Sequence, residues 1–317
     1  MKNKIIAYYL PQYHPIPEND EWWGKGFTEW TTVGKAKPLF KNHYQPRVPA
    51  DLGYYDLRIP EVREKQAILA KQAGIFGFCY WHYWFGNGKQ LLELPFNEVL
   101  KTGKPDFPFC LGWANESWKA KVWDASAEKK DKILIEQVYP GENDIIQHFH
   151  TVEIAFRDKR YIRHNGMPIF LIYKPLQYKD INTFISLWNH LIKERGIADK
   201  IYFIANVISE EEKEQCLNNG FDAVTYNPLS RIDNGYSRIN GLSKLLRRFY
   251  QHFTSRPLRT FDYSKVMNCF FTDEDKCENV IPFLLPNWDH SPRSGRFSVV
   301  LENSTPKKFG AHIRKVL

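Results

Sequence analysis

The chain has 317 residues, 43% of them hydrophobic and 25% charged, which excludes general disorder and is enough for one large domain. No apolar run is long enough to cross a membrane as a helix. The 44 basic and 36 acidic side chains give a formal charge of +8, and residues 231–265 alone carry eight basic and two acidic side chains. A charge concentrated in one segment indicates one contact surface rather than general affinity for nucleic acid, for which the chain has no motif.

Apolar runs of strand length alternate with helical patterns along the whole chain, as in α/β proteins with a parallel sheet. We expect strands at residues 5–10, 75–81, 107–113, 168–173, 201–206, 223–226 and near 280–285. We expect helices at residues 60–73, 89–100, 143–160, 180–195, 210–219, 241–252 and 306–316. No internal repeat or flexible linker interrupts this pattern, so a single domain over residues 1–317 is expected.

The alternation favours a (β/α)₈ TIM-type barrel over a doubly wound sheet, because no glycine-rich phosphate loop follows any strand. The strand count is one short, since the chain reaches Leu317 directly after the last helical segment. We therefore expect a barrel that lacks its last βα unit, unless residues 297–301 form a further strand.

A long aromatic loop is expected at residues 11–56, after the first strand. Loops of this size usually form lids or walls of a functional site. In a barrel this one would lie at the carboxyl end of the first strand, where barrel enzymes carry their catalytic groups.

Tryptophan is concentrated in the first part of the chain, where eight of the ten lie before residue 124. Three predicted strands end in aromatic and polar residues, around residues 8–14, 80–85 and 113–118. One interpretation is a large aromatic core. The other is a cleft lined with flat faces that stack on sugar rings.

Two glutamates are candidates for catalysis. Glu116 follows a strand directly and lies beside Asn115, between two tryptophans, where a carboxyl group could exchange a proton with a glycosidic oxygen. Glu29, in the long loop, is the second carboxylate that glycosidic cleavage requires. The alternatives are a helix-capping role for Glu116 and a loop-stabilising hydrogen bond for Glu29.

Five segments in order resemble the WbsX-like glycosyltransferase family of bacterial O-antigen and capsule clusters. They are residues 5–14, 23–30, 78–84, 113–116 and 288–293. This family is similar to the endo-mannosidases of glycoside hydrolase family 99. The resemblance implies a (β/α)₈ barrel that acts on cell-surface polysaccharide.

The chain departs from the family in one motif. Members normally continue into N-E-W-x-E-G, whose two glutamates correspond to the catalytic pair of the mannosidase relatives, and this motif is absent here. The departure implies either a truncated form of a longer enzyme or a protein that keeps the glycan cleft without the usual chemistry.

We predict Glu116 and Glu29 as catalytic residues and a further set as substrate ligands. The predicted ligands are His14, Trp30, Trp81, His82, Trp84, Trp113, Asn115, Trp118, Tyr226 and Asp289. No cofactor or metal is expected, because neither the histidines nor the five cysteines show ligand spacing. His148 and His150 are expected to be exposed on a helix, and the acidic triplet 273–275 to be a solvated turn.

The leading hypothesis is a carbohydrate-active enzyme of O-antigen, capsule or lipopolysaccharide biosynthesis, transferring or cleaving a glycosyl unit. The alternative is a catalytically inactive glycan-binding protein. The partner is then an oligosaccharide or polysaccharide and not a nucleic acid. The absence of a signal peptide and the unpaired cysteines predict a cytoplasmic protein. The apolar and basic faces of residues 241–253 suit either an outer barrel helix or contact with an anionic membrane.

Overall fold

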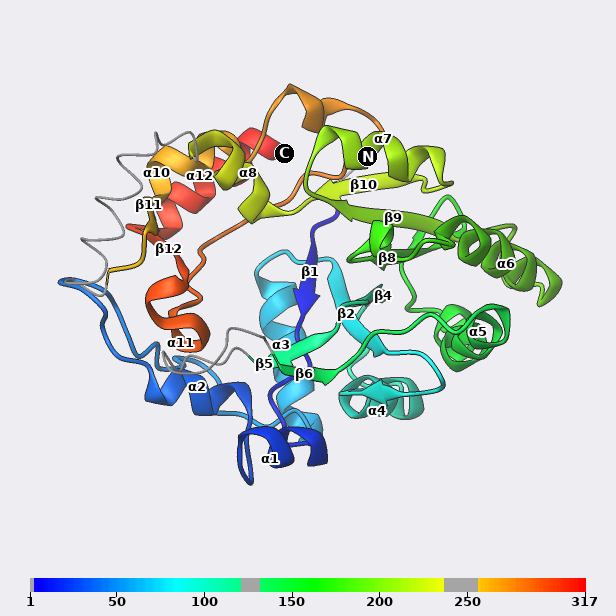
Figure 1. The fold of residues 1–317 in the computed structure, drawn as a ribbon, viewed down its shortest axis with the longest axis horizontal. Helices are drawn as coiled ribbons and strands as arrows, with labels where there is room; N and C mark the ends of the chain where they lie inside the picture. Colours follow the sequence, from blue (N-terminus) through cyan, green and yellow to red (C-terminus); the bar gives the residue numbers. More distant parts are fainter. Residues whose placement is uncertain (1–2, 121–131, 237–255) are drawn as a thin grey trace. The chain divides into compact units, whose positions relative to one another are not determined.

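The computed structural model describes residues 3–120, 132–236 and 256–317, coloured along the chain in Figure 1. Its contacts divide the chain into two compact units. The first unit comprises Met1–Gly26 and Asp56–Val224, and the second comprises Phe27–Tyr55 and Thr225–Leu317. The helix expected at 241–252, and with it the segment 241–253, falls outside the described residues.

The first unit is built on a curved, mainly parallel sheet (Figure 1). Its strand order is β1 (Ile6–Tyr9), β2 (Gly77–Trp84), β4 (Phe109–Trp113), β8 (Met167–Ile172), β9 (Tyr202–Val207) and β10 (Ala223–Tyr226). Neighbours from β1 to β9 pair in parallel. The short strands β3 (Gln90–Leu91) and β7 (Arg163–His164) pair antiparallel with β2 and β8, and β5 (Trp118–Ala120) forms a separate ribbon with β6 (Lys132–Ile135). The prediction of a parallel α/β sheet is confirmed.

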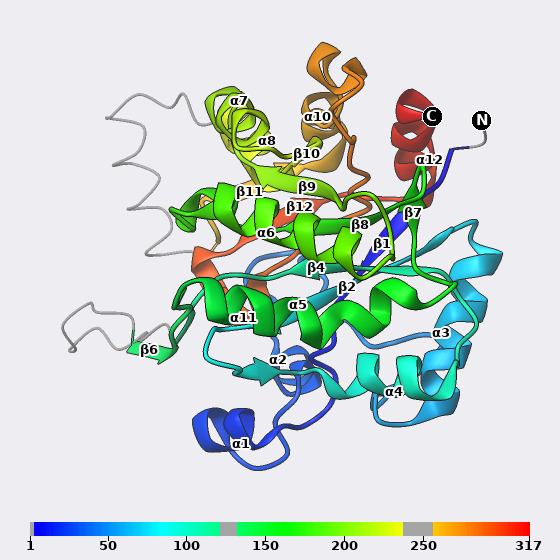
Figure 2. The ribbon, with the colours of Figure 1, turned by 90° about the vertical axis from the view of Figure 1, so that its right-hand side faces the viewer.

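Helices follow the strands and lie along one side of the sheet, as the views in Figures 1 and 2 agree. They are α3 (Pro60–Gln72), α4 (Leu94–Thr102), α5 (Glu142–Arg157), α6 (Ile181–Glu194) and α7 (Glu210–Asn218), with the short α1 (Pro17–Trp23) before α3. In α3, Pro60 occupies the first turn, where no backbone donor is needed, and Gly74 follows the helix with a φ of 80°.

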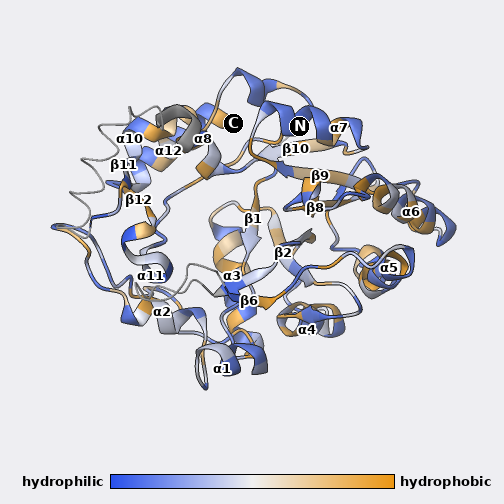
Figure 3. Ribbon diagram, in the orientation of Figure 1, coloured by the Kyte–Doolittle hydropathy of each residue, from blue (hydrophilic) through white to orange (hydrophobic). Residues whose placement is uncertain are grey.

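The core of this unit lies between the sheet and helices α5 and α6. In Figure 3 these helices carry both hydrophobic and hydrophilic segments, as expected for helices with one buried side. Trp188 of α6 has no exposed surface; its ring is tilted against Phe170 of β8 at 4.8 Å and meets Phe149 of α5 edge-on at 5.6 Å. Much of the aromatic content of the chain is therefore core, as one of the two interpretations predicted.

The second unit consists of short elements. They are α2 (Glu29–Lys35), α8 (Pro228–Tyr236), β11 (Arg259–Asp262), α10 (Tyr263–Val266), the 3₁₀ helices η2 (Met267–Cys269) and η3 (Asp273–Lys276), α11 (Ser291–Ser294), the 3₁₀ helix η4 (Gly295–Phe297), β12 (Val299–Glu302) and α12 (Pro306–Val316). Strands β11 and β12 pair in parallel. The strand expected near 280–285 is wrong, because these described residues form no strand, and the alternative at 297–301 corresponds to β12.

The loop expected at residues 11–56 contains helices α1 and α2. Its first part belongs to the first unit, and residues 27–55 belong to the second. Thr28 caps α2 by accepting a hydrogen bond from the backbone N–H of Trp30 at 3.2 Å. None of the described helices is both long and apolar enough to cross a membrane.

Candidate functional site

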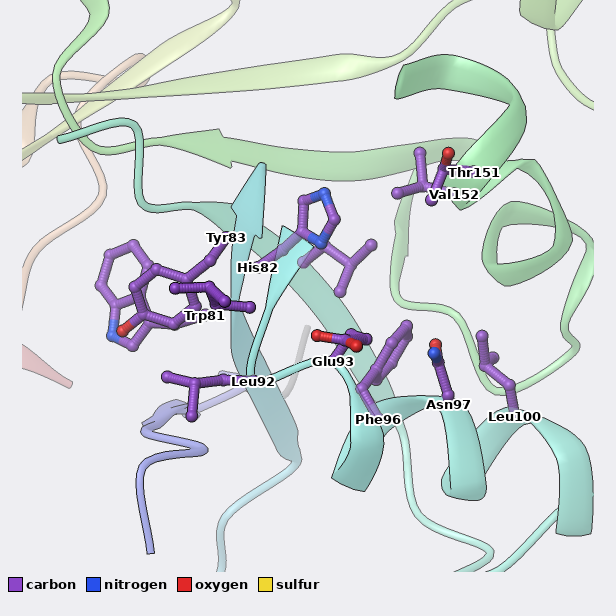
Figure 4. Close-up of a pocket in the computed structure, with 12 residues that line it drawn as sticks. Trp81, His82, Tyr83, Leu92, Glu93, Phe96, Asn97, Leu100, Thr151 and Val152 are labelled. Atoms are coloured by element: carbon purple, nitrogen blue, oxygen red, sulfur yellow. The ribbon is translucent and has the colours of Figure 1, made fainter. Parts of the chain in front are cut away.

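Strand β2 presents alternate side chains to the two faces of the sheet, as every strand does. Tyr80 packs 5.2 Å from Phe96 of α4, so the even-numbered positions face the helices. Trp81 instead stacks on Tyr8 of β1, and Figure 4 shows Trp81 and His82 on opposite sides of the strand. Trp81 therefore belongs to the face that the helices leave uncovered.

An aromatic strip runs across this face. The rings of Tyr8 and Trp81 are stacked 5.0 Å apart and 9° from parallel, and Tyr173, just after β8, meets Trp81 edge-on at 5.6 Å. Gly112 of β4 lies opposite Trp81, and a Cβ there would come within 3.2 Å of the indole. Tyr8 is 52% exposed, so the strip offers a flat apolar surface to a ligand.

Glu116 is close enough to this strip for its charge to act on Tyr173. It follows β4 and is exposed. Burial raises the pKa of the Tyr173 hydroxyl, and the negative charge of Glu116 raises it further. The Lys174 ammonium lies 5.0 Å from the centre of the Tyr173 ring. Residues just beyond the carboxyl ends of β4 and β8 thus supply a carboxylate, a phenol and an amine, and the phenol interacts with each of the other two.

Asn115 holds these two strand ends in place. Its amide nitrogen donates to the Lys174 carbonyl at 2.9 Å and to the Tyr139 hydroxyl at 3.0 Å, and its oxygen accepts from the Lys174 backbone N–H at 2.7 Å. The side chain is fully buried. Its polar atoms are engaged within the protein, which suits a positioning role rather than direct contact with a sugar.

Two of the predicted tryptophan ligands lie in the core. Trp84 donates its indole N–H to Asp144 of α5 at 3.0 Å and is 1% exposed. Trp113 donates to the carbonyl of Trp84 at 2.9 Å and is 2% exposed. Both indoles are covered by protein, so we assign them a structural role.

His82 also faces the helix layer, where it meets His148 of α5. Their Nε2 atoms lie 2.9 Å apart, so one ring donates and the other accepts. Burial lowers the pKa of His82 to about 4, and burial together with the neighbouring His82 lowers the pKa of His148. The expectation that His148 is exposed is wrong, because α5 turns it toward the sheet, whereas His150 is exposed as expected.

A cavity of about 20 Å³ adjoins His82, between β2, α4 and α5, and has room for about one water molecule. Figure 4 shows Phe96, Asn97 and Leu100 on α4 and Val152 on α5 around it. This space is too small for a sugar.

Two further predicted ligands of the first unit make other contacts. Trp118 of β5 packs edge-on against Tyr83 at 5.3 Å and Phe85 at 5.8 Å, in a partly buried aromatic cluster. His14 is buried, and burial lowers the pKa of its imidazole.

Glu29 and Trp30 begin α2 in the second unit. Burial raises the pKa of Glu29, and the ion pair with Arg293 at 2.8 Å offsets part of this effect. The Trp30 indole donates to the carbonyl of Tyr55 at 2.8 Å and meets the Tyr54 ring edge-on. Glu29 is thus the buried carboxylate of the predicted pair, and Glu116 is the exposed one.

Asp289 is the centre of a hydrogen-bond cluster in the second unit. It accepts from Gln45 Nε2 at 2.6 Å, His43 Nε2 at 3.1 Å and the Ser291 backbone N–H at 2.9 Å. Burial alone would raise the pKa of Asp289, but the hydrogen bonds from Ser291, His43 and Gln45 outweigh it and lower the pKa. The carboxylate is thereby held ionised and fixed.

Tyr226 ends β10 and is held by Arg231, whose guanidinium lies 3.7 Å from the ring centre. Arg231 also donates to Glu274 at 2.8 Å and pairs with Asp275 at 3.4 Å. The expectation of a solvated turn at 273–275 is wrong for Asp275, which is buried in η3 against this arginine. Among the described residues no group of three or more potential ligands could hold a metal ion.

Within the first unit, two of the predicted residues are linked through Tyr173, which meets Trp81 edge-on and whose pKa the charge of Glu116 raises. The structure adds Tyr8 and Tyr173, which sequence reasoning missed, although Tyr8 lies inside the strand expected at 5–10 and Tyr173 ends the strand expected at 168–173. Arg293 lies in one of the five family segments, but its role was not predicted. Its ion pair with Glu29 joins residues 264 positions apart, and such a contact has no local sequence signal. Glu116 and Glu29 belong to different units.

The chain matches the family model described as Glycosyltransferase WbsX over residues 5–317. It is similar to WxcX, an uncharacterized protein of Xanthomonas campestris pv. campestris, in strains ATCC 33913 and B100. The identity is 35% over 315 residues, covering 96% of this chain and 41% of WxcX. The chain therefore spans about two fifths of the length of these relatives.

Two solved structures of the GH99 endo-alpha-mannosidase from Bacteroides thetaiotaomicron, one of them in complex with BIS-TRIS-propane, are similar in fold. Their TM-scores are 0.51 and 0.52 at 14% sequence identity. The matches cover all of this chain and 80% and 81% of the mannosidase chains. At this identity the likeness concerns the fold.

Proposed function

Because the chain belongs to the WbsX glycosyltransferase family, we propose that it is a carbohydrate-active enzyme that transfers or cleaves a glycosyl unit. Its substrate is an oligosaccharide or polysaccharide of the bacterial surface, such as O-antigen, capsule or lipopolysaccharide. The proposal extends to the fold as a single (β/α)₈-type barrel, which the parallel strand order from β1 to β9 supports.

The observation that carries the proposal is the exposed carboxylate of Glu116 beside the Tyr8, Trp81 and Tyr173 strip. Flat aromatic faces bind the apolar face of a sugar ring, and a carboxyl group beside them exchanges a proton with the glycosidic oxygen. Glu116 is the proton donor in this proposal. Asn115 fixes the backbone beside it, and Lys174 supplies a positive charge next to the Tyr173 ring.

Glu29 is the second carboxylate of the proposal. Glycosidic cleavage takes two carboxyl groups, one that protonates the leaving oxygen and one that acts as base or nucleophile. Burial raises the pKa of Glu29 and the ion pair with Arg293 offsets part of this rise, so the ion pair is what would keep Glu29 ionised in the second of these roles.

Replacement of Glu116 by Gln tests the assignment. The amide keeps the shape and removes the proton, so turnover should fall about a hundredfold or more, while glycan binding persists. Turnover is measured by incubating the protein with labelled sugar nucleotides and, separately, with purified polysaccharide, since only a transferase consumes the nucleotide. Glu142→Gln, an exposed glutamate at the start of α5, is the matched control. If the Glu116→Gln variant turned over substrate at the wild-type rate, Glu116 would not be the proton donor.

A catalytically inactive glycan-binding protein is the second candidate. It is favoured by the absence of N-E-W-x-E-G from the sequence. Saturable oligosaccharide binding by the wild-type protein, with no turnover of either substrate class, would support it.

A further inference from the structure

The segment that carries His43, Gln45 and Arg47 is organised by Asp289, within the second unit. His43 Nδ1 accepts the backbone N–H of Leu39 at 3.1 Å, so the ring carries its hydrogen on Nε2 and donates it to Asp289. Both hydrogens of the Gln45 amide are used as well, toward Asp289 at 2.6 Å and Ser291 Oγ at 3.2 Å. The orientation of the Gln45 amide is therefore fixed.

This arrangement leaves two polar atoms without a hydrogen-bond partner among the residues that the structure describes, Gln45 Oε1 and Arg47 Nε. Both atoms are buried, and Gln45 as a whole is only 6% exposed. Gln45 Nε2 and Arg47 Nε lie 2.6 Å and 3.7 Å from the same oxygen of Asp289. A buried acceptor and a buried donor around one carboxylate suit a hydroxyl group, which both donates and accepts.

An exposed aromatic ring adjoins these atoms. The Arg47 side chain is 42% exposed, and its guanidinium lies 5.5 Å from the centre of the Tyr44 ring, which is 64% exposed. A sugar has an apolar face for such a ring and hydroxyls for the polar atoms at its edge.

The charges of this part of the second unit are balanced. Arg47 is offset by Asp289 at 3.7 Å, Arg256 by Glu302 at 2.7 Å and Arg293 by Glu29 at 2.8 Å. Since each of these three arginines has a carboxylate partner, none of them offers an unpaired charge to a uronate or a phosphate.

We propose that Tyr44, Gln45 and Arg47 form a subsite for a neutral hexose unit, with Asp289 as a positioning residue that orients the amide and the guanidinium. The inference rests on the proposed function for its substrate class, a glycan. It gives Tyr44, Gln45 and Arg47 a role in binding and restricts the bound unit to uncharged sugars.

The test measures binding of methyl glycosides of glucose, mannose and galactose, and of the matching methyl uronides, to the full chain by saturation-transfer NMR and calorimetry. We expect at least one neutral glycoside to bind more tightly than its uronide. Tyr44→Ala should weaken that binding about tenfold, and Arg47→Lys, which keeps the charge and removes the Nε donor, by at least threefold. Phe297→Ala is the matched control, because Phe297 is also exposed in the second unit with an arginine, Arg296, 5.1 Å away. It should bind as wild type.

Equal binding by wild type, Tyr44→Ala and Arg47→Lys would overturn the subsite, as would tighter binding of the uronides or an equal loss in Phe297→Ala. Binding of none of the sugars would mean that the open atoms hold water only, and would overturn it too. Unchanged melting temperatures identify a binding effect. Turnover assayed in parallel separates the two proposals. Tyr44-dependent binding without turnover would support the subsite and contradict the enzymatic function. Turnover without Tyr44-dependent binding would support the enzymatic function and contradict the subsite.

Discussion

Asn115 has no exposed surface and makes three hydrogen bonds, two with Lys174 at the end of β8 and one with the Tyr139 hydroxyl. Asn115→Ala leaves the Lys174 backbone N–H and the Tyr139 hydroxyl without this partner. Each buried polar group that loses its partner costs about 1–3 kcal/mol, so we expect a loss of roughly 3 kcal/mol in the free energy of unfolding, measured with urea. Asn97→Ala, at an exposed position of α4, should change it by less than about 0.5 kcal/mol. An equal loss in both variants would contradict the role given to Asn115.

The His82–His148 pair makes stability depend on pH. The unfolded histidines take up protons near pH 6.5, whereas in the folded chain burial lowers the pKa of His82 to about 4 and lowers that of His148 as well. Between these values the unfolded chain binds more protons, so stability falls as the pH falls. His82 alone should contribute a loss of about 3 kcal/mol by pH 4. Urea unfolding at a series of pH values measures it.

His148→Phe isolates this effect. It removes one titrating group and the pair itself, so the decline of stability from pH 6.5 to pH 4 should become shallower. His150→Gln changes an exposed histidine two residues away on the same helix and should leave the decline unchanged. A slope that His148→Phe does not alter would show that other groups cause the acid sensitivity.

At the scale of the elements, the position of the aromatic strip depends on how closely β2 and β4 approach each other. A Cβ on Gly112 would lie 3.1 Å from Cys79 Sγ and 3.2 Å from the Trp81 ring, so Gly112→Ala should displace the indole. We expect glycan affinity to fall at least threefold, measured by calorimetry, with tryptophan fluorescence reporting the movement. Gly34→Ala in α2, where a Cβ meets nothing within 4 Å, should bind as wild type. Unchanged affinity and fluorescence in Gly112→Ala would contradict this.

The sequence was sufficient to find the strands of the sheet but not their faces. Apolar runs such as residues 107–113 mark a parallel strand because it is buried on both sides. For the same reason they carry no alternation that tells which side a residue faces. Trp81 and Trp84 looked alike in the sequence. In the structure Trp81 lies on the face that the helices leave uncovered, and Trp84 lies in the core.

The second unit was harder to predict. Its elements are short, and residues 280–285 are apolar without forming a strand. Two of its contacts, the ion pair of Glu29 with Arg293 and the hydrogen bond of His43 with Asp289, join residues 264 and 246 positions apart. Local periodicity contains no information on such contacts, so the neighbours of Glu29 and Asp289 had to come from the structure.

For the molecule as a whole, contact with an anionic membrane through residues 241–253 remains a prediction from the sequence. Reversing Arg247 and Arg248 to Glu should reduce co-sedimentation with vesicles that contain phosphatidylglycerol, because each basic residue near such a surface contributes about 1 kcal/mol. Reversing Lys307 and Lys308 of α12 to Glu is the control for a general change of charge. Co-sedimentation that neither reversal affects would leave residues 241–253 as an ordinary solvent-facing segment.

The second unit combines residues 27–55 with residues 225–317, so its first segment leaves the ribosome long before the rest of the unit. The partners of the early segment, Asp289 and Arg293, emerge after the whole sheet of the first unit has been synthesised. At about 5–20 residues per second, this delay is roughly 10–50 s. During that time Glu29, His43 and Gln45 lack the partners that they have in the folded chain, so residues 27–55 are where proteases and chaperones should act on a stalled or shortened chain.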